Sequence, residues 1–131
     1  MSDWLVSADI ALTVLHVAVV LAILFLWIPR RTRRWHLWLV LATALSWFAL
    51  GLRYGIGYCF LSDWHWQVKR WRGQTDLPNS FIHHALADWL RLPLTETSTE
   101  VLTGLVFAFV GVLSLMLNIG EWRRRRPSPN R

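Results

Sequence analysis

The chain has 131 residues, which is enough for one domain. Hydrophobic residues make up 54% of it and charged residues only 17%, against about 25% in a typical soluble domain. This composition argues against a soluble protein and predicts an all-α integral membrane protein. The net charge is +6, and the arginines flank apolar stretches, so they favour anionic lipid headgroups rather than nucleic acid as the partner.

Three apolar stretches are each long enough to cross the hydrocarbon core of a bilayer, which takes about 20 helical residues. We expect the spans at about residues 8–28, 35–58 and 99–120, inside a single membrane domain of residues 1–120. The first stretch is expected to remain in the protein, because no basic residue precedes it. Pro29 and arginines follow it, where a cleavable signal peptide would have small residues.

Two clusters of arginines indicate how the spans are oriented. One cluster lies between the first two spans and the other in the tail, residues 121–131, which is expected to be disordered. With Arg131 the two clusters hold nine basic residues, against four between the second and third spans. The positive-inside rule therefore predicts a cytoplasmic C-terminus and an N-terminus on the outer side of the membrane. The residues expected to contact headgroups are Arg30, Arg31, Arg33, Arg34, Arg123, Arg124, Arg125 and Arg126.

The segment 59–97 is predicted to be an outer interfacial segment with one or two amphipathic helices. Ser62–Arg72 carries three tryptophans and three basic residues, so it is expected to lie on the headgroups with its indoles inward. Ser80–Leu92 has helical apolar periodicity, and both an interfacial and a re-entrant placement stay open. Thr97–Glu100 fits a capping box at the start of the third span.

Glycines on the spans are candidates for close helix packing. Gly51 and Gly55 form a small-xxx-small pair, and Gly104 and Gly111 recur in the third span. The alternative is that glycine is simply common in membrane helices.

Polar groups inside the spans are functional candidates, because they are expensive to place in hydrocarbon. Asp9, Thr13 and His16 share one helical face, with His16 about 12 Å below the outer end of its helix. Arg53 falls in the same leaflet and is a possible partner of Asp9. The alternative is that Asp9 caps its helix, Arg53 reaches the outer surface and His16 makes one interhelical hydrogen bond. Together with residues of the outer segment, the candidate polar site is Asp9, Thr13, His16, Arg53, Cys59, Asp63, His65, His83 and His84.

The sequence predicts no metal or haem cofactor, and the one pairing that stays geometrically open is His16 with His65, His83 or His84. His16 and His36 differ in depth by on the order of 15 Å, which is too far for one iron. The adjacent His83 and His84 point in different directions on a helix. Cys59 is the only cysteine, so a cysteine-rich metal knuckle and an intrachain disulfide are both excluded.

The chain carries a set of short motifs at Leu15–Ala18, the arginine-rich turn, His36, Gly57–Cys59, Leu61–Gln67 and Pro78–His84. As a set, these motifs resemble a bacterial family of short membrane proteins, domain of unknown function 2784, so the expected location is a bacterial inner membrane. The resemblance extends from about Leu15 to Val110, and implies a bacterial membrane protein without implying an activity. Where many members have Cys-Pro-Leu-Thr, this chain has Cys59-Phe60-Leu61-Ser62.

The small size, the glycines and the amphipathic outer segment favour a non-enzymatic accessory or scaffold component. Its partner would be another protein or a second copy of the chain. Two alternatives stay open. One is a redox, proton or enzyme component that uses the histidines and Arg53, and the other is a binder of lipid or a small molecule in the outer leaflet.

Overall fold

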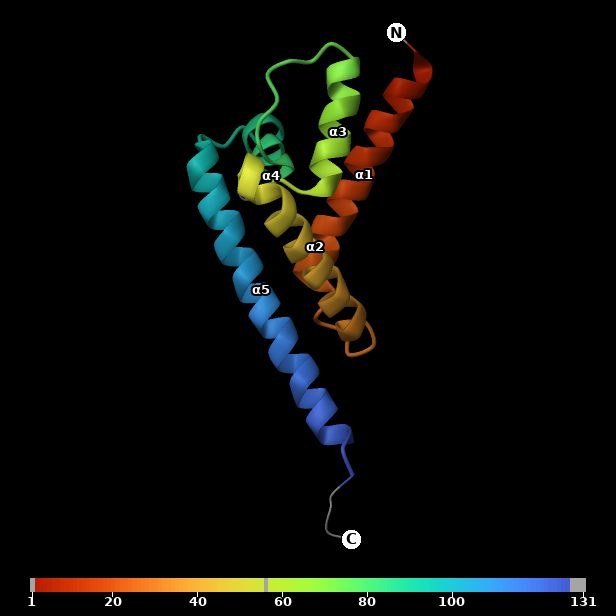
Figure 1. Cartoon of the computed structure of the whole chain (residues 1–131), viewed down its shortest axis with the longest axis vertical. Coiled ribbons are helices and arrows are strands. Elements are labelled where there is room, and N and C mark those ends of the chain that lie inside the picture. Colours follow the sequence, from red (N-terminus) through yellow and green to blue (C-terminus); the bar gives the residue numbers. More distant parts are fainter. Residues whose placement is uncertain (1, 56, 128–131) are drawn as a thin grey trace.

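The chain folds into three long helices, with shorter helical segments between the second and the third (Figure 1). The computed structural model describes residues 2–55 and 57–127, and it has no strand in these ranges. The remainder of the predicted tail, 128–131, lies outside the described residues. The elements are α1 (Asp3–Phe25), α2 (Arg33–Tyr54), α3 (Phe60–Trp71), α4 (Phe81–His84), the π-helical segment η1 (Ala85–Trp89) and α5 (Glu96–Arg125).

Helices α1, α2 and α5 are long and apolar enough to cross a membrane. The shortest has 22 residues, which is roughly 33 Å of helix against roughly 30 Å of bilayer hydrocarbon. Their outer surfaces are apolar as well. Leu45, Phe48 and Leu52 follow one face of α2 and are 70%, 69% and 79% exposed. A soluble monomer rarely exposes so continuous an apolar surface, so the predicted all-α membrane fold is confirmed.

The helix ends depart from the predicted span limits. Helix α1 starts five residues before residue 8, whereas α2 ends at Tyr54 rather than at residue 58. Gly55 ends α2 because its φ of +106° lies outside the helical range and is accessible mainly to glycine. Helix α5 continues through Arg125, so the first residues of the predicted tail are helical.

The start of α5 corrects the predicted capping box. Thr95, not Thr97, is the N-cap, and its side chain accepts a hydrogen bond from the Ser98 N–H at 3.1 Å. The helix therefore begins two residues earlier than the box implied. A threonine or serine three residues before another polar residue occurs twice in this stretch, which is why the sequence pattern did not separate the two positions.

Helices α1, α2 and α5 are held together by a fully buried histidine, His36. Its Nε2 donates to the Ile23 carbonyl at 2.7 Å, and its Nδ1 lies 2.8 Å from the Ser114 hydroxyl. Further along the α2–α5 contact, Gly111 lies against Val40, which a Cβ at Gly111 would meet at 3.4 Å. A Cβ at Gly51 would meet nothing within 4 Å, so Gly51 is not used for packing within the chain.

Helix α3 corrects the expectation of a helix lying flat on the headgroups. It runs alongside the N-terminal half of α1 (Figure 1), and its buried residues include His65, Trp66 and Lys69. Trp66 is 2% exposed and forms a small core with Tyr58 and Phe81. The physical reason is that the buried face of α3 carries polar groups whose partner is on α1. If α3 lay flat on the headgroups, its polar groups would have no partner on α1.

The segment predicted to be helical over 80–92 is α4 followed by η1. Ser80 caps α4 by accepting a hydrogen bond from the His83 N–H at 3.1 Å. Phe81 then enters the core beneath α3, 2% exposed. This short element therefore covers the space between α1 and α5 at the same end of the bundle as α3 (Figure 1).

Candidate functional site

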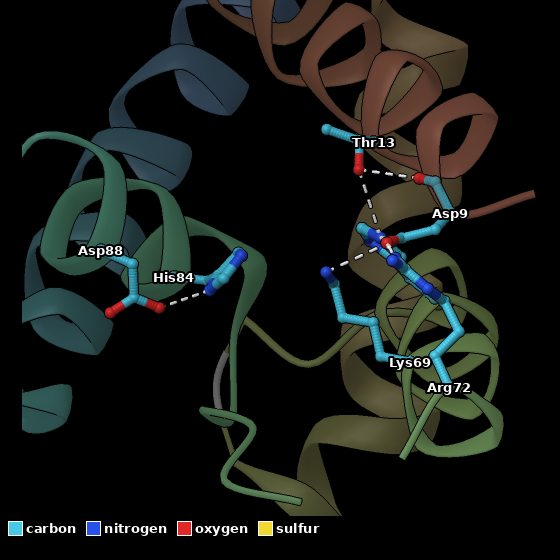
Figure 2. Close-up of polar contacts among 7 residues, drawn as sticks. Asp9, Thr13, Lys69, Arg72, His84 and Asp88 are labelled. Atoms are coloured by element: carbon cyan, nitrogen blue, oxygen red, sulfur yellow. Dashed lines mark hydrogen bonds and ion pairs between the residues drawn. The ribbon is translucent and has the colours of Figure 1, made fainter. Parts of the chain in front are cut away.

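Asp9 is the centre of a buried polar cluster between α1 and α3. Only 7% of the residue is exposed. One carboxylate oxygen lies 2.6 Å from Nε2 of His65 and 3.2 Å from Nζ of Lys69, and the other accepts from the Arg72 guanidinium. Figure 2 shows Lys69 and Arg72 reaching Asp9 from the same helix. The three partners are spaced i, i+4 and i+7 along α3, so they share one helical face.

Lys69 and Arg72 are site residues that the sequence analysis missed. The signal was present, because the spacing from His65 to Arg72 is that of a single helix face. The same stretch was interpreted as an amphipathic helix with its charges in water. Both side chains are in fact largely buried, at 10% exposed for Lys69 and 20% for Arg72.

The proposed pairing of Asp9 with Arg53 is wrong. Arg53 lies on the exposed surface of α2, where its guanidinium is 5.7 Å from the centre of the Tyr54 ring. The carboxylate of Asp9 is already surrounded by its three α3 partners. Arg53 is therefore not part of the cluster.

His65 is fully buried, and its burial determines its charge. Desolvation lowers the pKa of His65, with a smaller contribution from the positive charge of Lys69, and these outweigh the opposite effect of Asp9. His65 is therefore neutral, and its Nε2–H donates to Asp9. The second ring nitrogen, Nδ1, is then unprotonated, and it is buried with no hydrogen-bond partner among the described residues.

His16 lies beside His65, with the two ring centres 6.3 Å apart. Its Nε2 is 3.6 Å from the Cys59 sulfur, which in turn lies 3.4 Å from the Ser62 hydroxyl. Its Nδ1 is also buried without a partner in the described part of the chain. The cluster thus presents two neighbouring imidazole nitrogens that can accept or donate a proton. Buried polar atoms left unpaired in this way call for an explanation.

Thr13 links His65 to the backbone of α1. Its hydroxyl donates to the Asp9 carbonyl at 2.8 Å and lies 3.3 Å from Nε2 of His65 (Figure 2). The predicted face of Asp9, Thr13 and His16 is therefore turned toward α3. The structure brings together five of the predicted candidates: Asp9, Thr13, His16, Cys59 and His65.

The other candidates lie outside the cluster. Asp63 accepts hydrogen bonds from the Tyr58 hydroxyl at 2.8 Å and from Gln67 at 2.9 Å. Burial, and then this bond to Asp63, raise the pKa of Tyr58. His83 contacts the Thr99 hydroxyl at 3.0 Å, whereas His84 pairs with Asp88, away from Asp9 (Figure 2). The two adjacent histidines thus point in different directions, as the helical geometry predicted.

An apolar cavity of about 400 Å³ lies on the other side of Phe81 from this cluster. The Phe81 ring stacks on His16 at 4.0 Å with an interplanar angle of 9°, and it also lines the cavity. All three long helices contribute to the walls, and α4 and η1 supply the roof. Thr103 is the one polar residue among those that line it, which are Val17, Val20, Leu21, Ile23, Leu24, Trp47, Phe81, Ile82, Ala85, Leu86, Trp89, Leu102, Thr103, Val106 and Phe107.

Within residues 2–55 and 57–127, no three histidine, cysteine or acidic side chains are arranged to hold a metal ion. His36 serves the α1–α2–α5 contact and lies far along the bundle from His16, since it bonds to Ile23 near the C-terminal end of α1. The cluster at Asp9 is better described as an ion-paired imidazole site.

Comparison with known proteins places the chain in a family. No curated protein and no solved structure matches it. The model of one family, described as a protein of unknown function (DUF2784), matches residues 6–119 and so covers α2, α3, the α4–η1 roof and most of α1 and α5. Since that range holds most of each membrane-length helix and the whole polar cluster, the chain belongs to the DUF2784 family.

Proposed function

We propose that the protein is a non-enzymatic accessory component of a bacterial inner membrane that holds a lipid-like hydrocarbon chain in its apolar cavity. The observation that carries the proposal is the cavity itself. Its volume of about 400 Å³ lies within the roughly 300–1,000 Å³ of typical small-molecule sites. Its lining is hydrocarbon and aromatic except for Thr103.

A hydrocarbon chain is the occupant that the surroundings favour. The cavity lies among helices long and apolar enough to span a membrane, so bilayer lipid is the solvent around it. An empty cavity would deprive its walls of dispersion contacts. A lipid chain restores them, whereas a polar ligand would find only Thr103 and the indole N–H groups of Trp47 and Trp89 as hydrogen-bond partners.

The test is native mass spectrometry of the protein after gentle extraction. The wild-type protein is expected to carry lipid mass above 15.3 kDa. Val106→Trp places an indole in the cavity and should remove that mass. Leu105→Trp is the matched control, because Leu105 is 65% exposed on α5 and does not line the cavity.

Two outcomes would count against the cavity as the site. One is retention of the lipid by folded Val106→Trp, and the other is equal loss from both variants. If Val106→Trp fails to fold, Leu86→Trp fills the same cavity from the roof. The same spectra report any added protein mass, which the proposed protein partner or second copy requires. Gly51 supports such a contact, since space is open around it.

A second candidate function is a proton-carrying component at the Asp9 cluster. The observation in its favour is the pair of buried, unpartnered imidazole nitrogens on His16 and His65. In proteoliposomes, the wild-type protein should then speed the decay of an imposed pH gradient, and His65→Gln should not. His84→Gln is the control, because His84 pairs with Asp88 outside the cluster. A wild-type decay equal to that of protein-free vesicles would exclude this function.

A further inference from the structure

The α1–α2 turn and the C-terminal end of α5 meet at the opposite end of the bundle from α3 (Figure 1). Arg33, the first residue of α2, contacts both the α1–α2 turn and α5. Its guanidinium pairs with Glu121 at 2.7 Å and also donates to the Trp27 carbonyl at 3.0 Å. Asn118 donates to the Arg33 carbonyl at 3.1 Å. The turn and the last turns of α5 are thereby held in one arrangement.

A pocket of about 290 Å³ opens where these two elements meet. It is lined by Arg30 and Arg31 from the turn and by Glu121, Arg124 and Arg125 from α5. Glu121 is already neutralised by Arg33. In the described part of the chain, none of the four lining arginines has a carboxylate within ion-pair distance. The pocket therefore concentrates positive charge that nothing within these residues balances.

The chemistry and the position of the pocket identify its ligand. A guanidinium presents paired N–H donors that match the oxygens of a phosphate. Exposed tryptophans occur in the first turns of α2 and the last turns of α5, with Trp35, Trp38 and Trp122 at 73%, 61% and 55% exposed. Tryptophan gathers at headgroup depth in membranes. We infer that this pocket binds the phosphate headgroup of an anionic phospholipid, held between the α1–α2 turn and α5.

This inference rests on the membrane location but not on the occupancy of the apolar cavity. Of the eight arginines expected to contact headgroups, it assigns four to a single pocket. Arg34 and Arg123 belong to the same basic stretches but do not line the pocket. If the pocket is a specific site, loss of two lining arginines should weaken lipid binding more than loss of Arg34 and Arg123. If the whole basic surface binds lipid without a specific site, the two losses should be equal.

The experiment is a titration of the full chain in detergent with phosphatidylglycerol, and with phosphatidylcholine as the neutral lipid. Bound lipid is counted by native mass spectrometry. The protein should prefer phosphatidylglycerol, and Arg30→Gln/Arg124→Gln should weaken that binding on the order of thirtyfold. The control Arg34→Gln/Arg123→Gln removes the same charge and should bind nearly as the wild type does.

Three results would overturn the inference. They are equal weakening by both double variants, no preference for phosphatidylglycerol, and displacement of the lipid by inorganic phosphate. The last would indicate a soluble anion as the ligand. Should the first variant be unstable, Arg30→Lys/Arg124→Lys keeps the charge but loses the guanidinium geometry. An intermediate affinity is then expected, and a wild-type affinity would exclude recognition by the guanidinium groups.

Discussion

Asp9 is the residue on which the α1–α3 contact depends. It is the common partner of one neutral imidazole and two cations, and all of these groups are largely buried. A buried charge is tolerated when it is paired, but removing one partner leaves the others without compensation. For Asp9 this effect is multiplied, because His65, Lys69 and Arg72 all lose the same group at once.

Asp9→Asn should therefore lower the free energy of unfolding by about 3–5 kcal/mol. Thermal unfolding in detergent measures this loss. Tryptic cleavage after Lys69, Arg70 and Arg72 should also become faster, because α3 is released from α1. Asp3→Asn is the control, since Asp3 is exposed on the same helix and should unfold as the wild type does. Wild-type stability and wild-type cleavage of Asp9→Asn would contradict the proposed role of Asp9.

At the scale of elements, the short link between α2 and α3 decides where α3 lies. Gly55 and Gly57 in this link have φ of +106° and +91°. The link carries the chain across from the end of α2 to α1, and α3 then runs antiparallel to α1, with Cys59 beside His16 and Arg72 at Asp9 (Figure 1). A Cβ at Gly57 would also lie 3.3 Å from the Ser80 Cβ, at the start of α4. The link therefore sets the position of the α4–η1 roof as well.

Gly57→Ala should destabilise the protein by on the order of 1–3 kcal/mol, since the alanine would be held at an unfavourable φ. Gly51→Ala should change the stability in the opposite direction. Gly51 is in the interior of α2 with free space around it, so alanine there should stabilise the protein by about 0.5–1 kcal/mol. Thermal unfolding of the two variants side by side measures both. Equal effects would show that the conformation of the link is not what Gly57 supplies.

The two ends of the whole helix bundle differ in charge, because both arginine clusters lie at the same end. The arginine-rich turn and the end of α5 lie at one end, and α3 with the α4–η1 roof at the other (Figure 1). Because basic residues are retained in the cytoplasm, the arginine end is expected to be cytoplasmic. The Asp9 cluster and the apolar cavity's roof would then face outward.

Labelling of single cysteines tests this orientation. In a Cys59→Ser background, which removes the only native cysteine, Ser2→Cys should react with a membrane-impermeant maleimide in intact cells. Arg126→Cys should react only after the membrane is permeabilised. Trp64→Cys on α3, where Trp64 is 50% exposed, should behave as Ser2→Cys does. The reverse pattern would invert the proposed topology.

The three long helices can be predicted from the lengths of uninterrupted apolar sequence. A bilayer requires a minimum helix length, and few structures other than helices can cross it. The face of Asp9, Thr13 and His16 follows equally from helical spacing within one segment. The partners of that face do not, since 56 residues separate Asp9 from His65 and many cations could have reached the carboxylate. Arg53 is the plausible partner only if α3 lies flat on the headgroups. Only the fold of the α2–α3 link brings Lys69 and Arg72 to Asp9, and only the packing of α4–η1 over α1 and α5 creates the cavity. Local spacing determines which residues share a face, and long-range packing decides what that face meets.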